Sequence, residues 1–265
     1  MIKNLNARRA AGQEMVVRPL MPGITTHMKK RSLIAIAHRG ASAWAPENTV
    51  AAFDAALEVK CRAVEFDVRL TADGVPVVIH DETLERTTNG KGVVAETTWL
   101  DILRLDAGSW KHPRFAGTRV PNLEEALQAI SPCARPVIEL KVPISASLLA
   151  GLLARHEVLS DAIIMSFQPA ILESLRAEND HLVLFQLLES WSPKAVRSAR
   201  AAGMTGLVMK FDQWALDRAM MAKDIMPHVW AYDVNDPGAA AACGAMGLDG
   251  VITDFPDIVR ARAEA

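Results

Sequence analysis

From residue 33 onward, short apolar runs rich in valine and isoleucine alternate with longer segments whose apolar residues recur at helical spacing. We predict strands at residues 33–38, 63–70, 136–141, 162–167, 182–188, 206–210, 228–234 and 250–254. Strands that alternate with helices form a parallel sheet, because each crossover helix returns the chain to the same end of the sheet. The pattern therefore predicts an α/β fold, a TIM-type (β/α)8 barrel.

The chain departs from this alternation directly after the second predicted strand. Asp73-Gly74 is a hairpin signal, and VPVVIHD and an irregular stretch up to Pro121 follow it. We therefore predict a small insertion at about residues 82–121. In barrels, insertions at the carboxyl ends of strands build the rim of the active site.

The residues before the first strand show no sustained periodicity. Residues 1–27 carry several basic side chains and a single acid, Glu14. We expect residues 1–32 to form a flexible N-terminal extension and residues 33–265 to form the barrel domain. Met28 is an alternative to Met1 as the start of translation.

Composition narrows the functional classes. The chain has 265 residues, 50% of them hydrophobic, which is enough for a sizeable core. The formal net charge of −2 argues against a nucleic-acid-binding protein. The sequence has no apolar run long enough to span a bilayer and no secretory signal, so we expect a cytoplasmic protein without stable membrane insertion. The oligomeric state stays open.

Acidic side chains occur inside two of the predicted strands. Glu65 and Asp67 are two residues apart in AVEFDVRL, so both point to one face of the strand. Glu139 and Lys141 repeat this spacing in PVIELK, near the end of another strand. Acids in a buried parallel strand require neutralisation, and three acids without a neighbouring histidine or cysteine favour a hard divalent cation. We expect Mg²⁺ or Ca²⁺, with Mn²⁺ as a third possibility.

A structural ion pair is the alternative for these acids. In that interpretation Glu65 pairs with Lys141 or with an arginine inside the barrel. Buried ion pairs contribute little net stability, so a cluster of three acids is easier to explain by a bound metal. We favour the metal and keep the ion pair as the alternative.

Two histidines lie where apolar strands end. His38 closes LIAIAH and precedes Arg39, and His80 closes VPVVIH and precedes an aspartate. Histidine can act as a general base or a general acid near neutral pH, and phosphodiester cleavage requires one of each. Arg39 offers a planar fork for the oxygens of a phosphate, and Lys141 offers a point charge.

These residues lie in motifs that resemble the glycerophosphodiester phosphodiesterases of the bacterial cytoplasmic type. The motifs are AHRGASAWAPENT at 37–49, VEFDVRLTADGVPVVIHDETLERTTNGKG at 64–92, VPNLEEAL at 120–127 and IELK at 138–141. SFQP at 166–169 and ITDFP at 252–256 are also similar to the family. The resemblance covers nearly everything after residue 33.

The resemblance implies a metal-dependent hydrolase with the fold predicted above. Such an enzyme splits a glycerophosphodiester, its small-molecule partner, into sn-glycerol 3-phosphate and an alcohol, a reaction of glycerol and lipid metabolism. By resemblance, His38 and His80 form the acid–base pair, and Glu65, Asp67 and Glu139 hold the metal.

The resemblance also implies residues that contact the substrate. Arg39 and Lys141 correspond to phosphate contacts, and Glu47 of the PENT segment corresponds to a glutamate near the metal. Relatives often read WTVN in the seventh strand, whereas this chain reads YDVN from Tyr232 onward. Tyr232 or the nearby Trp230 is therefore expected to make the substrate contact of that tryptophan.

Two other functions remain open from the sequence. A lysophospholipase D-like enzyme would need an apolar rim, for which Trp99, Trp110 and Phe115 of the insertion are the candidates. A barrel that only binds phosphate esters would have no use for two histidines and three acids together. We find no motif directed at a particular head group, so we expect a tolerant leaving-group site.

Overall fold

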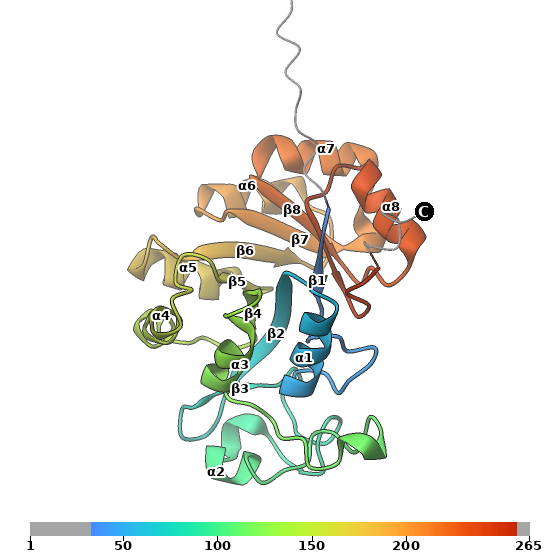
Figure 1. Ribbon diagram of the computed structural model, residues 1–265. Helices are drawn as coiled ribbons and strands as arrows, with labels where there is room; N and C mark the ends of the chain where they lie inside the picture. The colour runs from blue at the N-terminus through green and yellow to red at the C-terminus, as the bar shows by residue number, and fades with distance from the viewer. Residues whose placement is uncertain (1–32, 259–265) are drawn as a thin grey trace, which may run out of the picture. The chain divides into compact units, whose positions relative to one another are not determined.

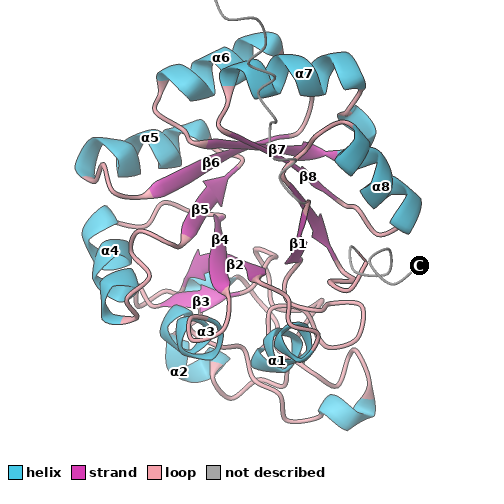
Figure 2. Cartoon of the chain, turned by 45° about the horizontal axis from the view of Figure 1, so that its top comes forward, coloured by secondary structure: helices cyan, strands magenta, loops and turns pink. Residues whose placement is uncertain are grey.

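The computed structural model describes residues 33–258. Eight parallel strands close into a ring in the order β1, β2, β4, β5, β6, β7, β8 and β9, and β9 pairs again with β1 (Figure 2). The predicted barrel is therefore confirmed. The predicted extension at 1–32 and the alternative start at Met28 lie outside the described residues.

The eight strands of the ring agree with the predicted ranges to within one or two residues, whereas the short β3 was not among the predicted strands. The strands are β1 (Ile34–Ala37), β2 (Ala63–Leu70), β3 (Pro76–Val78), β4 (Arg135–Leu140), β5 (Ile163–Ser166), β6 (Val183–Leu188), β7 (Gly206–Lys210), β8 (His228–Tyr232) and β9 (Gly250–Thr253). The largest difference is at β8, predicted to continue to residue 234. Asp233 has a φ of 60°, in the left-handed region, and this conformation ends the strand.

Helices surround the ring (Figures 1 and 2). They are α1 (Val50–Glu58), α2 (Trp99–Ile102), α3 (Leu123–Ile130), α4 (Ala146–Arg155), α5 (Pro169–Glu178), α6 (Pro193–Ala201), α7 (Leu216–Ile225) and α8 (Pro237–Ala245), with short 3₁₀ turns at η1 (Val94–Glu96), η2 (Pro113–Phe115) and η3 (Phe211–Gln213). Caps fix several helix starts. Thr49 caps α1, Ser192 caps α6, and Asn122 with Glu125 forms a capping box at α3.

The insertion begins with a hairpin directly after β2, so it starts earlier in the chain than the predicted residue 82. β3 is antiparallel to β2 and pairs with it from Leu70–Pro76 back to Val68–Val78. The backbone N–H of Ile79 then donates to the carbonyl of Asp67 at 3.1 Å. The hairpin thus returns the chain to the level of Asp67, and His80 follows two residues after β3 ends.

The remainder of the insertion has a small apolar core of its own. This cluster consists of Val77, Ile79, Leu84, Val94, Ile102, Ala107 and Val120. Two contacts also fasten the insertion to the loop after β1: Lys111 donates to the carbonyl of Ser42, and Arg114 donates to that of Trp44. The insertion is therefore a packed unit at the rim of the barrel.

Two apolar layers define the barrel. Side chains that face its interior, including Ile36, Val137, Phe185 and Trp230, form one cluster. A larger cluster fills the space between the strands and the helices. Both faces of the strands are buried, which explains why the strands read as continuous apolar runs in the sequence. None of the helices within residues 33–258 combines the length and the apolar character that crossing a bilayer requires.

Candidate active site

A cavity of about 220 Å³ opens at the carboxyl ends of the barrel strands. Its polar wall consists of His38, Arg39, Glu65, His80, Glu139 and Lys141, and its other wall consists of Met165, Phe167, Leu187, Tyr232, Asp233 and Ile252. Barrel enzymes place their chemistry at this end of the strands. The cavity therefore combines most of the residues singled out in the sequence.

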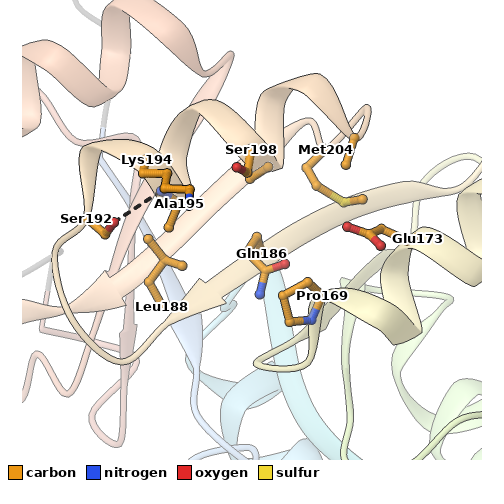
Figure 3. A pocket seen from close by; sticks show the side chains of 11 residues that line it. Pro169, Glu173, Gln186, Leu188, Ser192, Lys194, Ala195, Ser198 and Met204 are labelled. Carbon is orange, nitrogen blue, oxygen red and sulfur yellow. Dashed lines mark hydrogen bonds between the residues drawn. The ribbon is translucent and has the colours of Figure 1, made fainter.

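Another cavity, of about 310 Å³, lies in the outer layer between α5, β6 and α6 (Figure 3). Among its lining residues, only Glu173 and Lys194 carry a formal charge, and the floor includes Leu188 and Met204. Size therefore does not identify the functional site. The chemistry of the lining residues favours the cavity at the mouth of the barrel.

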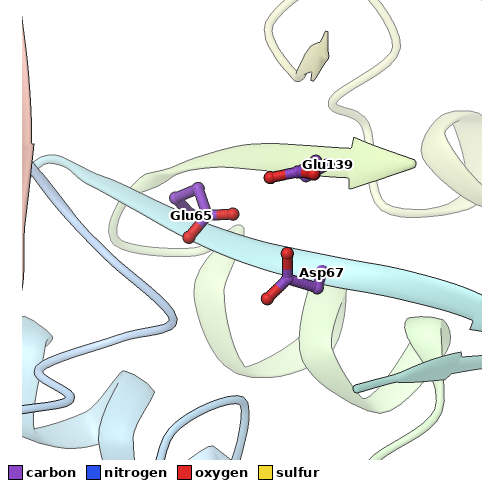
Figure 4. Close-up of side chains that lie close together, drawn as sticks. All are labelled: Glu65, Asp67 and Glu139. Carbon is purple, nitrogen blue, oxygen red and sulfur yellow. The ribbon is translucent and has the colours of Figure 1, made fainter. Parts of the chain in front are cut away.

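Three acids lie close together at the polar wall: Glu65 and Glu139 line the cavity, and Asp67 lies beside them (Figure 4). Glu65 and Asp67 come from β2, and Glu139 comes from β4, where it is the direct neighbour of Asp67 in the sheet. Each offers one carboxylate oxygen, and these oxygens lie within 4.8 Å of one another. All three side chains are buried. The predicted alignment of the acids on one face of the strands is therefore present.

Lys141 partly neutralises this cluster. Its ammonium group donates to Glu139 and lies 3.0 Å from Oδ1 of Asp67. Asp67 also accepts a hydrogen bond at 2.8 Å from the amide of Asn48, whose own carbonyl accepts from the backbone N–H of Asp67. Lys141 therefore pairs with Glu139 and Asp67, whereas a pair of Glu65 with Lys141 or an arginine, as the alternative states it, is not among the ion pairs of the described residues.

Arg39 contacts the same acids from the loop after β1. Its backbone N–H donates to Oε2 of Glu65 at 2.8 Å, and its Nε lies 3.2 Å from Oδ2 of Asp67. One terminal nitrogen of the guanidinium donates to Glu47 at 2.7 Å. Arg39 and the following Gly40 have φ angles of 54° and 82°, so the chain turns sharply here and presents the backbone N–H to the cluster.

The carboxylates carry opposite pKa shifts. Burial would raise the pKa of Asp67, but the charges of Lys141 and Arg39 outweigh burial and hold it well below its usual range. Burial and the charge of Asp67 raise the pKa of Glu139, and the same two causes raise the pKa of Glu65 to about 8. The cluster therefore contains more acid than its two cations neutralise.

Glu65 shows directly that the cluster has too few positively charged partners. Its Oε1 is buried and accepts no hydrogen bond, although unpaired carboxylate oxygens in a protein interior are costly. A divalent cation among the three acids would satisfy this atom. The all-oxygen donor set suits Mg²⁺, Ca²⁺ or Mn²⁺ better than zinc. The residues present therefore fit a metal site.

His38 is held by a carboxylate behind it. Its Nδ1 lies 2.7 Å from Oδ1 of Asp254, at the end of β9. Ser42 and Asn235 donate to the same carboxylate at 2.8 and 2.7 Å. A carboxylate fixed in this way orients the ring and stabilises its protonated form.

His80 has a corresponding partner. Its Nδ1 lies 2.7 Å from Oδ1 of Asp81. Arg86, from the insertion, donates to both oxygens of Asp81 at 2.6 and 2.9 Å. Each histidine therefore has Nδ1 engaged with a carboxylate and Nε2 left for other contacts.

The two histidines differ in the direction of their pKa shifts. Burial alone would lower the pKa of His38, but the hydrogen bond to Asp254 and the charge of Glu65 outweigh it, and the pKa is raised. Burial lowers the pKa of His80 in spite of the nearby charge of Asp67. The directions of these shifts make His38 the better proton donor of the two and His80 the better acceptor.

The two candidate aromatic residues of β8 occupy different places. Tyr232 lines the cavity and contacts Phe167 edge to face at 5.9 Å between ring centres. Trp230 is 3% exposed and packs against Phe185 inside the barrel, with ring centres 4.6 Å apart. The structure therefore brings Tyr232 to the cavity and leaves Trp230 in the interior layer.

Sequence reasoning missed four residues around the site. Asn48 contacts Asp67, Asp254 contacts His38, and Asp81 and Arg86 lie behind His80. All four lie inside motifs quoted for the family resemblance, Asp254 in ITDFP at 252–256, so their motif membership was an available signal. Asp254 also follows a strand end, as His38 does, which indicated the same edge of the barrel.

Known proteins are similar to this chain in sequence and in fold. The sequence matches the Glycerophosphoryl diester phosphodiesterase family over residues 38–258. A glycerophosphodiester phosphodiesterase of Bacillus subtilis (strain 168) is 32% identical over 250 residues, which cover 85% of each protein. Another B. subtilis protein, YhdW, is 36% identical over 239 residues, which cover 84% of this chain and 95% of YhdW.

A solved structure agrees with the sequence matches. A phosphodiesterase of Oleispira antarctica, determined in complex with the product sn-glycerol 3-phosphate, aligns with a TM-score of 0.82 and 29% identity. The alignment covers 88% of this chain and 97% of that one. The match of the family to most of the chain and the shared barrel lead to one conclusion: this chain belongs to the glycerophosphoryl diester phosphodiesterase family.

Proposed function

We propose that the chain hydrolyses glycerophosphodiesters to sn-glycerol 3-phosphate and an alcohol. One observation carries the proposal: two acids of a buried three-acid cluster, one of them Glu65 with an unpaired oxygen, line the same cavity as two histidines whose Nδ1 atoms each contact a carboxylate. The product bound to the O. antarctica relative supports the choice of substrate.

The charged residues account for phosphate binding. Arg39 and Lys141 both line the cavity and can offer N–H donors to the phosphate oxygens. A divalent cation held by Glu65, Asp67 and Glu139 would supply Lewis-acid chemistry, by offsetting phosphate charge and lowering the pKa of a hydroxyl bound to it. We propose Mg²⁺ or Ca²⁺ as the resident ion.

The histidines account for the proton transfers. Nε2 of His80 takes the proton of the attacking oxygen as that oxygen bonds to phosphorus. The bond from phosphorus to the leaving oxygen breaks, and His38 gives its proton to that oxygen, so the alcohol leaves neutral. The opposite pKa shifts of the two histidines support this assignment of base and acid.

The acid role of His38 predicts a shift in the pH profile of Asp254→Asn. Asp254 helps to raise the pKa of His38, so its replacement lowers that pKa. Because His38 must be protonated to act, activity falls as pH rises through its pKa, and the alkaline limb of kcat/KM should move to lower pH. The matched control is Asp257→Asn, an exposed aspartate three residues further on. An unchanged alkaline limb in Asp254→Asn would contradict the assignment.

The proposed reaction is tested by a coupled assay for glycerol 3-phosphate. The chelated protein is supplied with Mg²⁺, Ca²⁺ or Mn²⁺ singly and with glycerophosphocholine, glycerophosphoethanolamine or lysophosphatidylcholine. We expect metal-dependent turnover of the glycerophosphodiesters. Cleavage of lysophosphatidylcholine yields choline and lysophosphatidic acid, so this substrate is followed by choline release. Preferred release of choline from lysophosphatidylcholine would instead identify a lysophospholipase D-like enzyme, for which Trp110, 41% exposed on the insertion, would belong to the apolar rim.

A further inference from the structure

The guanidinium of Arg86 lies between two carboxylates at the rim of the cavity. It donates to both oxygens of Asp81 at 2.6 and 2.9 Å and to both oxygens of Glu47 at 2.8 and 2.9 Å. These four bonds use four of the five N–H groups that an arginine has. A lysine could not reproduce them, because its ammonium group lacks the planar fork.

The two carboxylates have different functions in this arrangement. Asp81 holds Nδ1 of His80 at 2.7 Å, so its orientation sets the orientation of the ring. Glu47 lies in the loop after β1 and is itself held by Arg39 at 2.7 Å. Arg86 therefore connects Asp81, the partner of His80, to Glu47 in the loop after β1.

The backbone that carries Arg86 is fixed as well. Leu84 is 1% exposed in the core of the insertion, and its N–H donates to the carbonyl of Gly92. The hydroxyl and the N–H of Thr88 both donate to the carbonyl of Leu84, which closes a turn around Arg86. The guanidinium is thus presented by a packed turn.

We propose that Arg86 is a positioning residue of the reaction, which orients His80 through Asp81 and so makes catalysis depend on the insertion. The inference rests on the proposed role of His80 in hydrolysis. The hydrogen bond from Arg86 is also the main reason that the pKa of Asp81 lies well below its usual range, so Asp81 stays an acceptor for the N–H of His80.

The test is a double-mutant cycle on glycerophosphocholine turnover. We expect Arg86→Gln to lower kcat about 10–100-fold, the scale for losing an outer partner of an active-site group. The KM should change less, because Arg86 does not line the cavity. If Arg86 acts through Asp81, adding Arg86→Gln to Asp81→Asn should cost little more than Asp81→Asn alone. Arg104→Gln is the matched control, because Arg104 lies in the insertion and is 75% exposed.

The outcomes separate this inference from the proposed function. Wild-type rates in Arg86→Gln would overturn the proposed role of Arg86, and so would a double mutant in which the losses of Arg86→Gln and Asp81→Asn multiply. In either case an inactive His80→Ala would leave the role of His80 intact. An active His80→Ala would instead refute the role of His80 itself. If Arg86→Gln does not fold, Arg86→Lys decides the matter: it keeps the charge, loses the fork and should still show the kcat defect in a protein with a normal melting curve.

Discussion

Alanine at His38 or at His80 should lower kcat by about 10²–10⁴-fold, the range for losing a positioned acid or base. Both side chains are partly exposed at the cavity, 25% for His38 and 34% for His80, so their removal should leave the melting temperature nearly unchanged. Steady-state kinetics and a thermal melt check the two parts. Retained activity in either variant would remove that histidine from the mechanism.

The leaving group distinguishes the two histidines. A glycerophosphodiester of 4-nitrophenol releases an anion that needs little protonation. We therefore expect the defect of His38→Ala to shrink on this substrate, whereas the defect of His80→Ala persists. Equal defects on both substrates would contradict the assignment of His38 as the acid.

Replacement of Glu65 by glutamine should abolish most of the stabilisation by added metal without destabilising the chelated protein. The pKa of Glu65 is raised to about 8, so in the metal-free protein this carboxyl is mostly protonated at pH 7, and glutamine mimics that form. For the wild type, metal at 100 times its Kd should contribute about 2.7 kcal/mol, which corresponds to roughly 5–11 °C in melting temperature for a domain of this size. Thermal melts with and without chelator measure both effects.

The ion-pair alternative predicts the opposite pattern. If Glu65 served only a structural pairing, glutamine at this position would cost about 3 kcal/mol or more, and chelator would change nothing. Glu124→Gln is the matched control, because Glu124 pairs with Arg155 on the surface of α3. A melting curve that is indifferent to metal, together with a destabilised Glu65→Gln, would leave the ion pair as the explanation.

Metal affinity should also depend on pH. Because the pKa of Glu65 is raised, protonation of this carboxyl group stabilises the folded protein without metal. This contribution to the stability is lost as pH rises through about 8. Metal must displace the proton, so its affinity should increase by up to about tenfold per pH unit below the pKa and level off above it. Titration of metal binding at several pH values provides the measurement.

The barrel and the acid cluster were predictable because both depend on short-range patterns. The i, i+2 spacing of Glu65 and Asp67 places both on one face of β2 whatever the rest of the chain does. Contacts between distant segments carry no such pattern. Asp254 lies 216 residues from His38, and Glu47 lies 39 residues from Arg86, so only the closed ring and the packed insertion bring them together.

Two features of β8 were also not predictable from the sequence pattern. The left-handed conformation of Asp233 ends β8 before residue 234, although the apolar Val234 would fit a longer strand. Trp230 and Tyr232 are two residues apart on the same face of β8, and only the depth of the cavity separates a buried ring from a lining one. Depth along a strand is set by packing from several elements at once.

The proposed catalytic residues lie in two regions, joined by the hairpin of β2 and β3, that should differ in how easily they unfold locally. The acids and His38 belong to the closed ring, whose strands each pair on both sides. β3, which leads to His80, pairs with β2 on one side and makes only an isolated bridge, from Val77 to Asn122, on the other. Local opening of the insertion would withdraw His80 while the ring and its cation site stay intact. Catalysis should therefore fail under mild denaturant before cation binding does, and amide exchange in the insertion should be faster than in β2 or β4.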